Sequence, residues 1–238
     1  MNLSEKNERE EIMTKTIVAI GGGEIGEGET LPIDEYIVSL AGMVRPKLLF
    51  IPTASNDAPE YIKKVTKIYG EQLGCEVDTL CLITAPPSLE AIKEKILTAN
   101  IIYVGGGNTA KLMGFWRRYQ VDKFLKEAYV TGTILAGISA GAICWFEYGY
   151  SDSFKEETGE FVIVEGLGVF PMVCCPHYES RPMFDDYMAT ATDMRAIAIE
   201  DHCAMVFQDN AYGVLRSREG AQAYLILNEQ DVVHKQPF

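Results

Sequence analysis

Apolar runs of strand length alternate with stretches of helical periodicity through the first two thirds of the chain. The first run is TIVAI, which leads into three consecutive glycines, and the run KLLFIP follows after one helical stretch. Such alternation is typical of a parallel sheet with helices packed on its faces. The pattern predicts strands over residues 16–20, 47–52, 77–83, 101–104 and 133–137.

Between these strands, apolar residues recur at the spacing that places them on one face of a helix. In the first such stretch Ile33, Ile37 and Leu40 share a face. In another, Ser88 precedes the apolar positions as an N-terminal cap does. The spacing predicts helices over residues 32–43, 60–73, 88–98, 109–118 and 121–129.

After residue 139 the pattern changes to short β-like runs, which we expect to form antiparallel or mixed sheet completing the same domain. We therefore expect one α/β domain over residues 14–238, with a mostly parallel central sheet flanked by helices. The polar segment 1–13 is expected to be disordered. The β-like runs cover residues 161–164, 169–175, 196–199, 204–208 and 223–227.

Charge limits the partners that this chain can bind. The formal net charge is −13 over 238 residues and the positive residues are scattered, so neither nucleic acid nor an anionic membrane surface is an expected partner. No apolar run approaches the length that spans a bilayer, and the first dozen residues resemble neither a signal peptide nor an anchor. We expect a cytoplasmic protein, either a monomer or a homodimer.

The cysteine pattern predicts no metal site. The six cysteines form no CxxC pair and show no His/Cys spacing typical of zinc sites. Several lie in apolar runs, which favours small buried side chains in a reducing compartment. We expect neither a metal nor an organic cofactor. The cysteines are Cys75, Cys81, Cys144, Cys174, Cys175 and Cys203.

The segment Gly-Ile-Ser-Ala-Gly around Ser139 is the first chemical signal. It follows the buried run ILAG directly and precedes the run AGAICWF, which is predicted to be a helix. A nucleophilic serine on a sharp strand-to-helix turn needs small neighbours, and the helix N-terminus directs free backbone N–H groups toward it. Ser139 is therefore the predicted nucleophile of a hydrolase.

A serine nucleophile needs a base, and the chain has only three histidines. His177 follows the apolar run VFPMVCCP, so it is expected at the end of a sheet strand, where α/β sites assemble. His234 lies in the last residues and is expected to be solvated, although an ordinary α/β-hydrolase places its histidine last. His202 lies beside two acids and fits a surface or packing role.

The third member of such a triad is a carboxylate that orients the histidine. Glu200 and Asp201, between two predicted strands, are the best placed. Asp152 is a second possibility, and Asp185 or Asp186 a third.

The run YVGGGNT at residues 103–109 ends a buried strand and opens a helix. Such a turn presents backbone N–H groups to an anion, including the oxyanion that develops during acyl transfer. One donor from Gly106 or Gly107 and one from Ala140 would complete an oxyanion hole.

A competing motif lies after the first strand, where Gly21, Gly23 and Gly26 match the dinucleotide-binding pattern. Glu24 lies inside this loop, where a pyrophosphate would bind, and the second strand ends without the acid that would bind a ribose. We therefore expect a glycine turn at a strand end. A nucleotide-dependent oxidoreductase remains an alternative.

Three motifs together resemble the peptidase E family of aspartyl dipeptidases and their cyanophycinase relatives: GGGN at 105–108, GISAGA at 137–142 and PHY at 176–178. The resemblance implies a fold similar to class I glutamine amidotransferases, with serine in place of the cysteine nucleophile. It also implies the order Ser, His, acid, which favours His177 over His234. The family acid is a glutamate, whereas the alignment places Asp201 there.

The resemblance also implies a substrate class. Peptidase E acts on dipeptides with N-terminal aspartate and cyanophycinase on β-linked aspartyl-arginine units, so an aspartyl carboxylate needs a cation. Arg181 is expected to supply it, unless it is a surface residue paired with Asp185 or Asp186, and Asn108 is the other expected substrate-binding residue. We therefore expect an intracellular serine dipeptidase that acts on small peptides. A non-catalytic amidotransferase-like binding protein is the remaining alternative.

Overall fold

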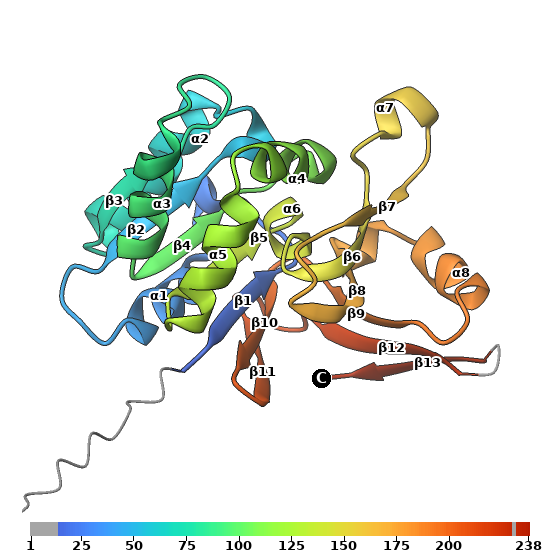
Figure 1. The fold of residues 1–238 in the computed structure, drawn as a ribbon. Helices are drawn as coiled ribbons and strands as arrows, with labels where there is room; N and C mark the ends of the chain where they lie inside the picture. Colours follow the sequence, from blue (N-terminus) through green and yellow to red (C-terminus); the bar gives the residue numbers. More distant parts are fainter. Residues whose placement is uncertain (1–13, 230–231) are drawn as a thin grey trace, which may run out of the picture.

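The strands of the computed structural model form two sheets that lie side by side (Figure 1). The structure describes residues 14–229 and 232–238, so the segment 1–13, predicted to be disordered, lies outside the described residues. In the first sheet the strand order is β11-β10-β1-β5-β4-β2-β3, and the five strands from β1 to β3 in this order are parallel. Its strands are β1 (Thr16–Ile20), β2 (Lys47–Ile51), β3 (Glu76–Thr79), β4 (Ile101–Val104), β5 (Ile134–Ile138), β10 (Cys203–Gln208) and β11 (Ala211–Arg216).

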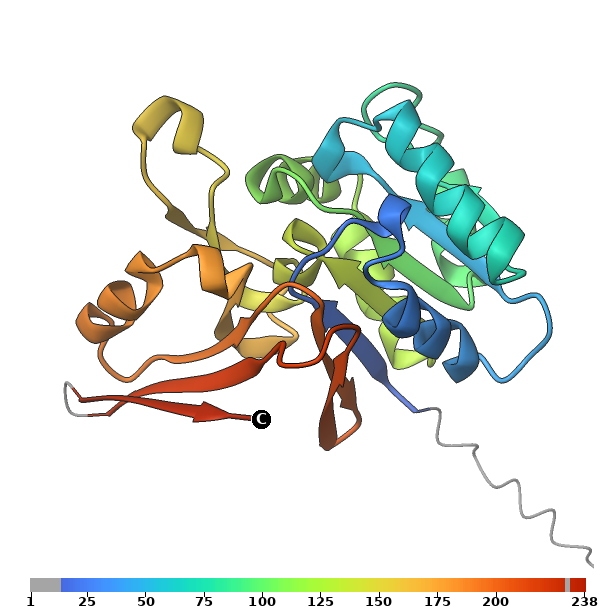
Figure 2. The same ribbon diagram turned by 180° about the vertical axis from the view of Figure 1, so that it is seen from behind.

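Helices cover both faces of this sheet, because its strands are apolar on both sides (Figures 1 and 2). On β1, Ile17 and Ala19 pack with α3, α4 and α5, whereas Val18 and Ile20 pack with α1 and α2. The expected α/β class with a mostly parallel core is confirmed. The helices are α1 (Leu31–Leu40), α2 (Pro59–Val65), which continues as a π-helix over Thr66–Gln72, α3 (Leu89–Thr98), α4 (Thr109–Arg118) and α5 (Val121–Val130).

The second sheet is mixed, with the order β13-β12-β9-β8-β6-β7. One face packs against α8 (Met183–Thr190), where Phe184 and Met188 are fully buried. Cys174 and Ile197 face the other way and belong to the same hydrophobic cluster as Ile17 of the first sheet, so the two sheets share a core. Its strands are β6 (Phe146–Ser151), β7 (Val162–Glu165), β8 (Phe170–Pro176), β9 (Arg195–Ile199), β12 (Ala223–Glu229) and β13 (Val232–Pro237).

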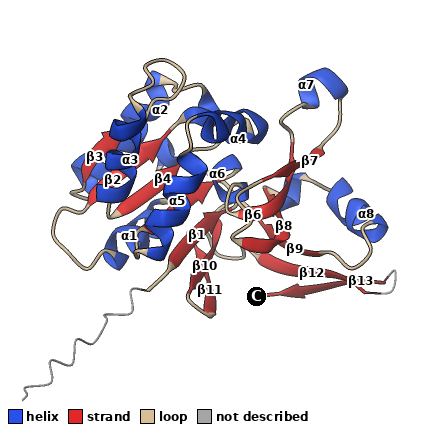
Figure 3. Cartoon of the chain, in the orientation of Figure 1, coloured by secondary structure: helices blue, strands red, loops and turns tan. Residues whose placement is uncertain are grey.

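The structure differs from the predicted elements in three ways: one helix is shorter, one strand ends early, and several elements were not predicted (Figure 3). The helix after Ser139, α6, ends after one turn (Ala140–Ile143), and the chain enters β6, where Phe146 is fully buried. β3 ends early, because the N–H groups of Ile83 and Thr84 donate to the buried Asp57 carboxylate instead of a neighbouring strand. The pattern did not predict the short helix α7 (Lys155–Thr158), α8, β6, β11 or β13.

All six cysteines are free, and Cys81 alone among them is partly exposed, as the buried-cysteine prediction largely anticipated. Within the described residues, no cluster of three His, Cys, Asp or Glu side chains is arranged to hold a metal ion. None of the helices in residues 14–229 and 232–238 is long and apolar enough to cross a membrane.

Candidate active site

Ser139 lies directly after β5 in a strained turn. Its backbone has φ 56° and ψ −113°, a region that costs a non-glycine residue of the order of 1–3 kcal/mol. Hydrogen bonds hold it there: its N–H donates to the Ile20 carbonyl at 3.0 Å, and its carbonyl accepts from Ala142 and Ile143 at 2.9 and 3.0 Å. The predicted strand-to-helix turn is present, and it places Ser139 at the carboxyl end of the parallel strands.

The flanking glycines are required by close backbone packing. A Cβ on Gly137 would lie 2.1 Å from the Gly141 carbonyl oxygen, and a Cβ on Gly141 would lie 2.1 Å from the Val104 carbonyl oxygen. These distances are far below van der Waals contact. The chain therefore folds back on itself at Gly137, and packs against β4 at Gly141, only because both positions lack a side chain.

His177 lies at the end of β8 and reaches both Ser139 and Asp201. Its Nε2 lies 2.8 Å from Ser139 Oγ, and its Nδ1 lies 2.5 Å from Asp201 Oδ1. The backbone of His177 is left-handed, with φ 52°, which turns the side chain away from the line of β8. The structure thus brings together three of the predicted residues in one hydrogen-bonded array.

The environment of Asp201 favours its ionised form. The hydrogen bond from His177 holds the pKa of Asp201 below its ordinary value against the opposing effect of partial burial, and electrostatic interactions with His177, His202 and Arg218 lower the pKa of Asp201 further. Its backbone N–H donates to both carboxylate oxygens of Glu179, at 2.9 and 3.1 Å. A carboxylate that stays charged is suited to accept the Nδ1–H of a histidine.

Within the described residues, the other acids and histidines that the sequence left open form no hydrogen bond with the side chain of Ser139 or His177. The Glu200 carboxylate accepts from the Gln222 N–H at 2.9 Å and from the Tyr224 hydroxyl at 3.3 Å, so it faces β12. Asp185 accepts from the Tyr178 hydroxyl at 2.6 Å, and Asp186 lies beside it on α8. His234 is exposed on the edge strand β13, and His202 donates its backbone N–H to Gly22. Asp152 lines the cavity that contains Ser139.

The glycine turn after β4 lies against Ser139. A Cβ on Gly106 would lie 3.3 Å from Ser139 Cβ. Three N–H groups of the turn are bound: Gly105 donates to Ile51 at 3.1 Å, Gly106 to the Tyr61 hydroxyl at 3.3 Å and Asn108 to Ala54 at 2.8 Å. Among the described residues, the N–H groups of Gly107 and Ala140 donate to no protein acceptor.

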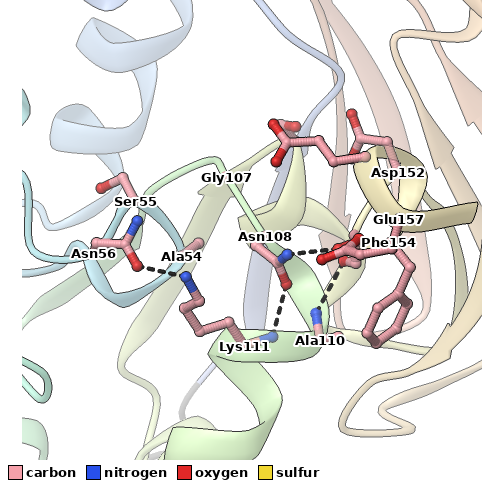
Figure 4. Close-up of a pocket in the computed structure, with 13 residues that line it drawn as sticks. Ala54, Ser55, Asn56, Gly107, Asn108, Ala110, Lys111, Asp152, Phe154 and Glu157 are labelled. Carbon is pink, nitrogen blue, oxygen red and sulfur yellow. Dashed lines mark hydrogen bonds between the residues drawn. The ribbon is translucent and has the colours of Figure 1, made fainter. Parts of the chain in front are cut away.

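A cavity of about 870 Å³ opens at Ser139. Figure 4 shows Lys111 on one side of Asn108, and Asp152, Phe154 and Glu157 on the other. Lys111 Nζ donates to Asn56 Oδ1 at 2.6 Å and forms no salt bridge within the described chain, so its charge is not neutralised. The cavity therefore has a cationic side and an acidic side.

Asn108, an expected substrate-binding residue, lines this cavity, but its amide is engaged by the protein. Its Oδ1 accepts from the Lys111 N–H at 2.8 Å and caps α4, and its Nδ2 donates to the Ser153 carbonyl at 2.7 Å. Asn108 therefore joins the two sides of the cavity and leaves few free polar atoms for a ligand.

Arg181 does not occupy the position expected of it. Only 4% of its surface is exposed; its guanidinium donates to the Tyr150 carbonyl and lies 4.9 Å from the centre of the Phe161 ring. It is neither among the residues that line the Ser139 cavity nor paired with Asp185 or Asp186. A buried guanidinium needs a hydrogen-bond acceptor or an aromatic ring as a partner. Here the Tyr150 carbonyl and the Phe161 ring are those partners.

The glycine loop after β1 is part of the site in a way that the sequence did not indicate. A Cβ on Gly22 would lie 1.9 Å from Asp201 Oδ1 and 2.4 Å from His177 Nδ1. Gly22 also pairs with Asp201 as a single parallel bridge. The bare backbone of Gly22 therefore makes room for the His177–Asp201 pair. Three consecutive glycines after the strand beside β5 were the available signal.

The same loop is unsuited to a dinucleotide. The Gly26 N–H donates to the Glu24 carboxylate at 2.9 Å, and the Glu24 N–H donates to the Glu29 carboxylate at 2.7 Å. Glu24 also pairs with Lys64 at 3.1 Å. The donors that a pyrophosphate would need already bind the carboxylates of the loop, which agrees with the expected glycine turn.

Comparisons with known proteins identify the family. Residues 10–215 match the profile of Peptidase family S51. An uncharacterized peptidase of Bacillus subtilis (strain 168), YgaJ, is 34% identical over 230 residues, covering 94% of this chain and 97% of the relative. Peptidase E of Nostoc sp. (strain PCC 7120) is 22% identical over 225 residues, covering 87% of this chain and 88% of the relative.

A solved structure agrees at the level of the fold. The crystal structure of a peptidase from an acI-B1 Actinobacterium superimposes with a TM-score of 0.68 at 19% identity, covering 95% of this chain and 98% of the other. The match spans both sheets and confirms the amidotransferase-like α/β fold. Together with the profile match, this shows that the chain belongs to peptidase family S51, the family of peptidase E and cyanophycinase, and that it is a serine peptidase.

Proposed function

We propose that Ser139 is the nucleophile of this peptidase, His177 its general base and Asp201 the acid that orients the histidine. The observation that carries the proposal is the continuous hydrogen-bonded array from Ser139 Oγ through both nitrogens of His177 to Asp201. Ser139 Oγ attacks the peptide carbonyl carbon while His177 Nε2 takes its proton. Asp201 accepts the Nδ1–H and stabilises the imidazolium that forms.

The remaining steps follow from the same groups. The tetrahedral intermediate collapses when His177 returns the proton to the leaving amine, and an acyl-enzyme on Ser139 remains. His177 then activates a water, which releases the acid product and restores the Ser139 hydroxyl. The proposed oxyanion donors are the N–H groups of Gly107 and Ala140, which have no acceptor within residues 14–229 and 232–238, whereas the N–H of Gly106 donates to Tyr61.

The proposed substrates are dipeptides with an N-terminal aspartate. They carry a side-chain carboxylate and an α-ammonium group, and the cavity at Ser139 has Lys111 on one side and Asp152 and Glu157 on the other. In this proposal Lys111, rather than Arg181, binds the aspartyl carboxylate. Its charge has no carboxylate partner in the described chain, so it is available.

A cyanophycinase-like activity is the second candidate. The acids Asp152, Glu156 and Glu157 line the cavity, so they outnumber Lys111 there. An arginine side chain attached to an aspartyl unit would place a guanidinium opposite these carboxylates. This observation favours β-linked aspartyl-arginine substrates.

The test is an assay of Asp-X dipeptides, β-aspartyl dipeptides and arginine-rich aspartyl polymers with the wild type and Ser139→Ala. We expect Ser139→Ala to lose turnover by several orders of magnitude, as removal of a triad nucleophile does. Ser55→Ala is the matched control, because it removes a hydroxyl from the same cavity and should stay near wild-type activity. Labelling by a fluorophosphonate, followed by mass spectrometry of the modified peptide, identifies the nucleophile independently of the substrate.

Two results would overturn the proposal. Equal turnover by the wild type and Ser139→Ala would exclude Ser139 as the nucleophile. Failure of the folded wild type to react with the fluorophosphonate would show that Ser139 is not activated and would favour a non-catalytic binding protein.

A further inference from the structure

Tyr61 lies on α2, far in sequence from the motifs, and touches the turn that faces Ser139. Its hydroxyl accepts the hydrogen bond from the Gly106 N–H at 3.3 Å. Its ring packs edge-on against Phe50 of β2, with centroids 5.2 Å apart and planes at 73°. The hydroxyl is thus held in place by ring packing.

The glycine at position 105 makes this contact possible. A Cβ there would lie 2.8 Å from Tyr61 Cε1 and 3.2 Å from the Phe50 ring. The Tyr61 ring therefore packs directly on the bare backbone of Gly105, and its hydroxyl reaches the next N–H along the chain. Gly106 in turn packs against the Ser139 side chain, so one glycine separates Tyr61 from the nucleophile.

The hydrogen bonds of the turn determine which N–H remains free. The carbonyls of Ile51 and Ala54 fix Gly105 and Asn108 at its two ends, and Tyr61 fixes Gly106 between them. Gly107, with φ 134°, lines the cavity beside Ser139, and its N–H has no acceptor in the part of the chain that the structure describes. A backbone turn that is rich in glycine is otherwise free to rotate.

We propose that Tyr61 is a positioning residue: by accepting the Gly106 N–H it fixes the 105–108 turn with the Gly107 N–H directed at the developing oxyanion. This inference rests on the proposed function of Ser139. Preorganised donors stabilise a transition state because they need no reorganisation as charge develops. Burial raises the pKa of Tyr61 to about 12, so the acceptor is a neutral hydroxyl and not an anion that would repel the oxyanion.

The test is Tyr61→Phe, which keeps the ring on Gly105 and Phe50 and removes only the hydroxyl. We expect kcat to fall about tenfold with KM nearly unchanged, because the turn then samples orientations that do not stabilise the transition state. The rate of Ser139 phosphonylation by a fluorophosphonate should fall by a similar factor, since the phosphonyl oxygen occupies the same hole. Tyr119→Phe, which removes a hydroxyl at the end of α4, is the matched control.

The outcomes separate the two proposals. If the wild type is phosphonylated at Ser139 and Tyr61→Phe reacts equally fast with an unchanged kcat, the role of Tyr61 is wrong while that of Ser139 stands. A change in KM alone, or a loss of activity matched by a loss of the folded fraction in circular dichroism, would likewise overturn the positioning role. Absence of wild-type labelling would overturn both.

Discussion

Two residues of the proposed triad have positive φ angles, and their side chains meet in a hydrogen bond. Ser139 has φ 56° and His177 has φ 52°, and each directly follows a strand. A side chain that continued the strand would point into one face of the sheet and be covered by helices. The positive φ of each residue therefore turns its side chain away from the face of its sheet. Both side chains then lie at the carboxyl ends of the strands, where a substrate can reach them.

At the scale of single residues, we predict that Lys111 determines the preference for substrates with an N-terminal aspartate. Lys111→Met should raise KM for Asp-X dipeptides about tenfold, a loss of ~1.4 kcal/mol, because the aspartyl carboxylate loses its charge-assisted partner. KM for dipeptides with a neutral N-terminal residue should change little. Steady-state kinetics on both substrates measures the difference.

The control for Lys111 is Lys155→Met. Lys155 lies on α7, with its ammonium 4.5 Å from the centre of the Phe161 ring, and does not line the cavity. It should leave both KM values near the wild type. The same change in KM for charged and neutral substrates would exclude Lys111 as the carboxylate-binding residue.

At this scale the sequence located Ser139 and His177 but not the details around them. Their motifs are local, and the turn that each needs is encoded by its neighbours. The residues alone could not separate Glu200 from Asp201, because adjacent positions after a strand face opposite ways. Only the family resemblance placed the acid at Asp201, and in the structure Asp201 faces His177 whereas Glu200 faces β12. The roles proposed for Tyr61 and Lys111 rest on contacts with Gly106 and Asn56. These pairs lie 45 and 55 residues apart in the sequence, so no local pattern reveals the contacts.

At the scale of elements, the site is assembled by backbones that approach one another at glycines. β1, β4 and β5 end side by side, and a glycine after each of them approaches another segment too closely for a side chain. Gly22 approaches Asp201 and His177, Gly107 approaches the Ala54 carbonyl, and Gly141 approaches the Val104 carbonyl. At Gly22 the neighbouring atoms belong to His177 and Asp201 themselves. Close approach of loops therefore determines the spacing of the reacting groups.

Gly22→Ala tests this dependence. The added Cβ must displace Asp201 or His177, so kcat should fall about 100-fold, the order expected when a catalytic group moves by about 1 Å. Gly114→Ala is the matched control, since a Cβ at this α4 position meets no atom within 4 Å and alanine favours helix. The measurements are kcat and the thermal midpoint; a Gly22→Ala enzyme within twofold of wild type would contradict the prediction.

For β11, β13 and α7, the failure of prediction follows from exposure. The inner strands and their helices were predicted well, because strands buried on both faces give continuous apolar runs and helices give a strong period. β11 and β13 are edge strands with mostly exposed residues, so they lack alternation. α7 has four residues and none of them is buried, which leaves no periodic signal.

At the scale of the whole molecule, a buried polar cluster joins α1 to the π-helix that continues α2. Asp34 of α1 is fully buried and accepts from Thr30 Oγ1 at 2.8 Å and from the Tyr69 hydroxyl at 2.6 Å. The Tyr69 ring packs on Tyr103 of β4, at 5.1 Å between centroids. Burial raises the pKa of Asp34 from 3.8 to about 7, despite these hydrogen bonds.

The raised pKa makes Asp34 a pH-dependent contribution to stability. Between pH 4 and 7 the folded protein holds a proton that the unfolded chain releases, so the contribution is complete below pH 3.8 and is lost as pH rises through about 7. Asp34→Asn should remove this loss. We expect the difference in free energy of unfolding, Asp34→Asn minus wild type, to increase as pH rises from 4 to 7.

Urea unfolding at several pH values measures this difference. Acids with lowered pKa values, including Asp201 and Glu24, act in the opposite direction but are common to both proteins, so the subtraction cancels them. Glu90→Gln is the control, because it also removes one carboxylate but from an exposed position on α3, and Glu90 does not act on the pKa of Asp34. Parallel curves for Asp34→Asn and the wild type would show that Asp34 is ionised in the folded protein.

The global arrangement of two sheets could be predicted only in part. A parallel core and mixed β-structure after residue 139 follow from the sequence pattern, but the division into two sheets does not, because β10 and β11 return to the first sheet after β9 has joined the second. That return depends on the pairing of β10 with β1, across nearly the whole chain. Local periodicity carries no information about such a pairing.

The connection from β9 to β10, which returns the chain from the second sheet to the first, must keep its length. It consists of Glu200, Asp201 and His202, and every backbone N–H in it is bound: to Gln222, to Glu179 and to Gly22. One residue more or fewer would shift all three bonds and carry the carboxylate away from His177. The number of residues between β9 and β10 therefore sets the position of the Asp201 carboxylate. The exposed loop around α7 can vary in length without moving that carboxylate.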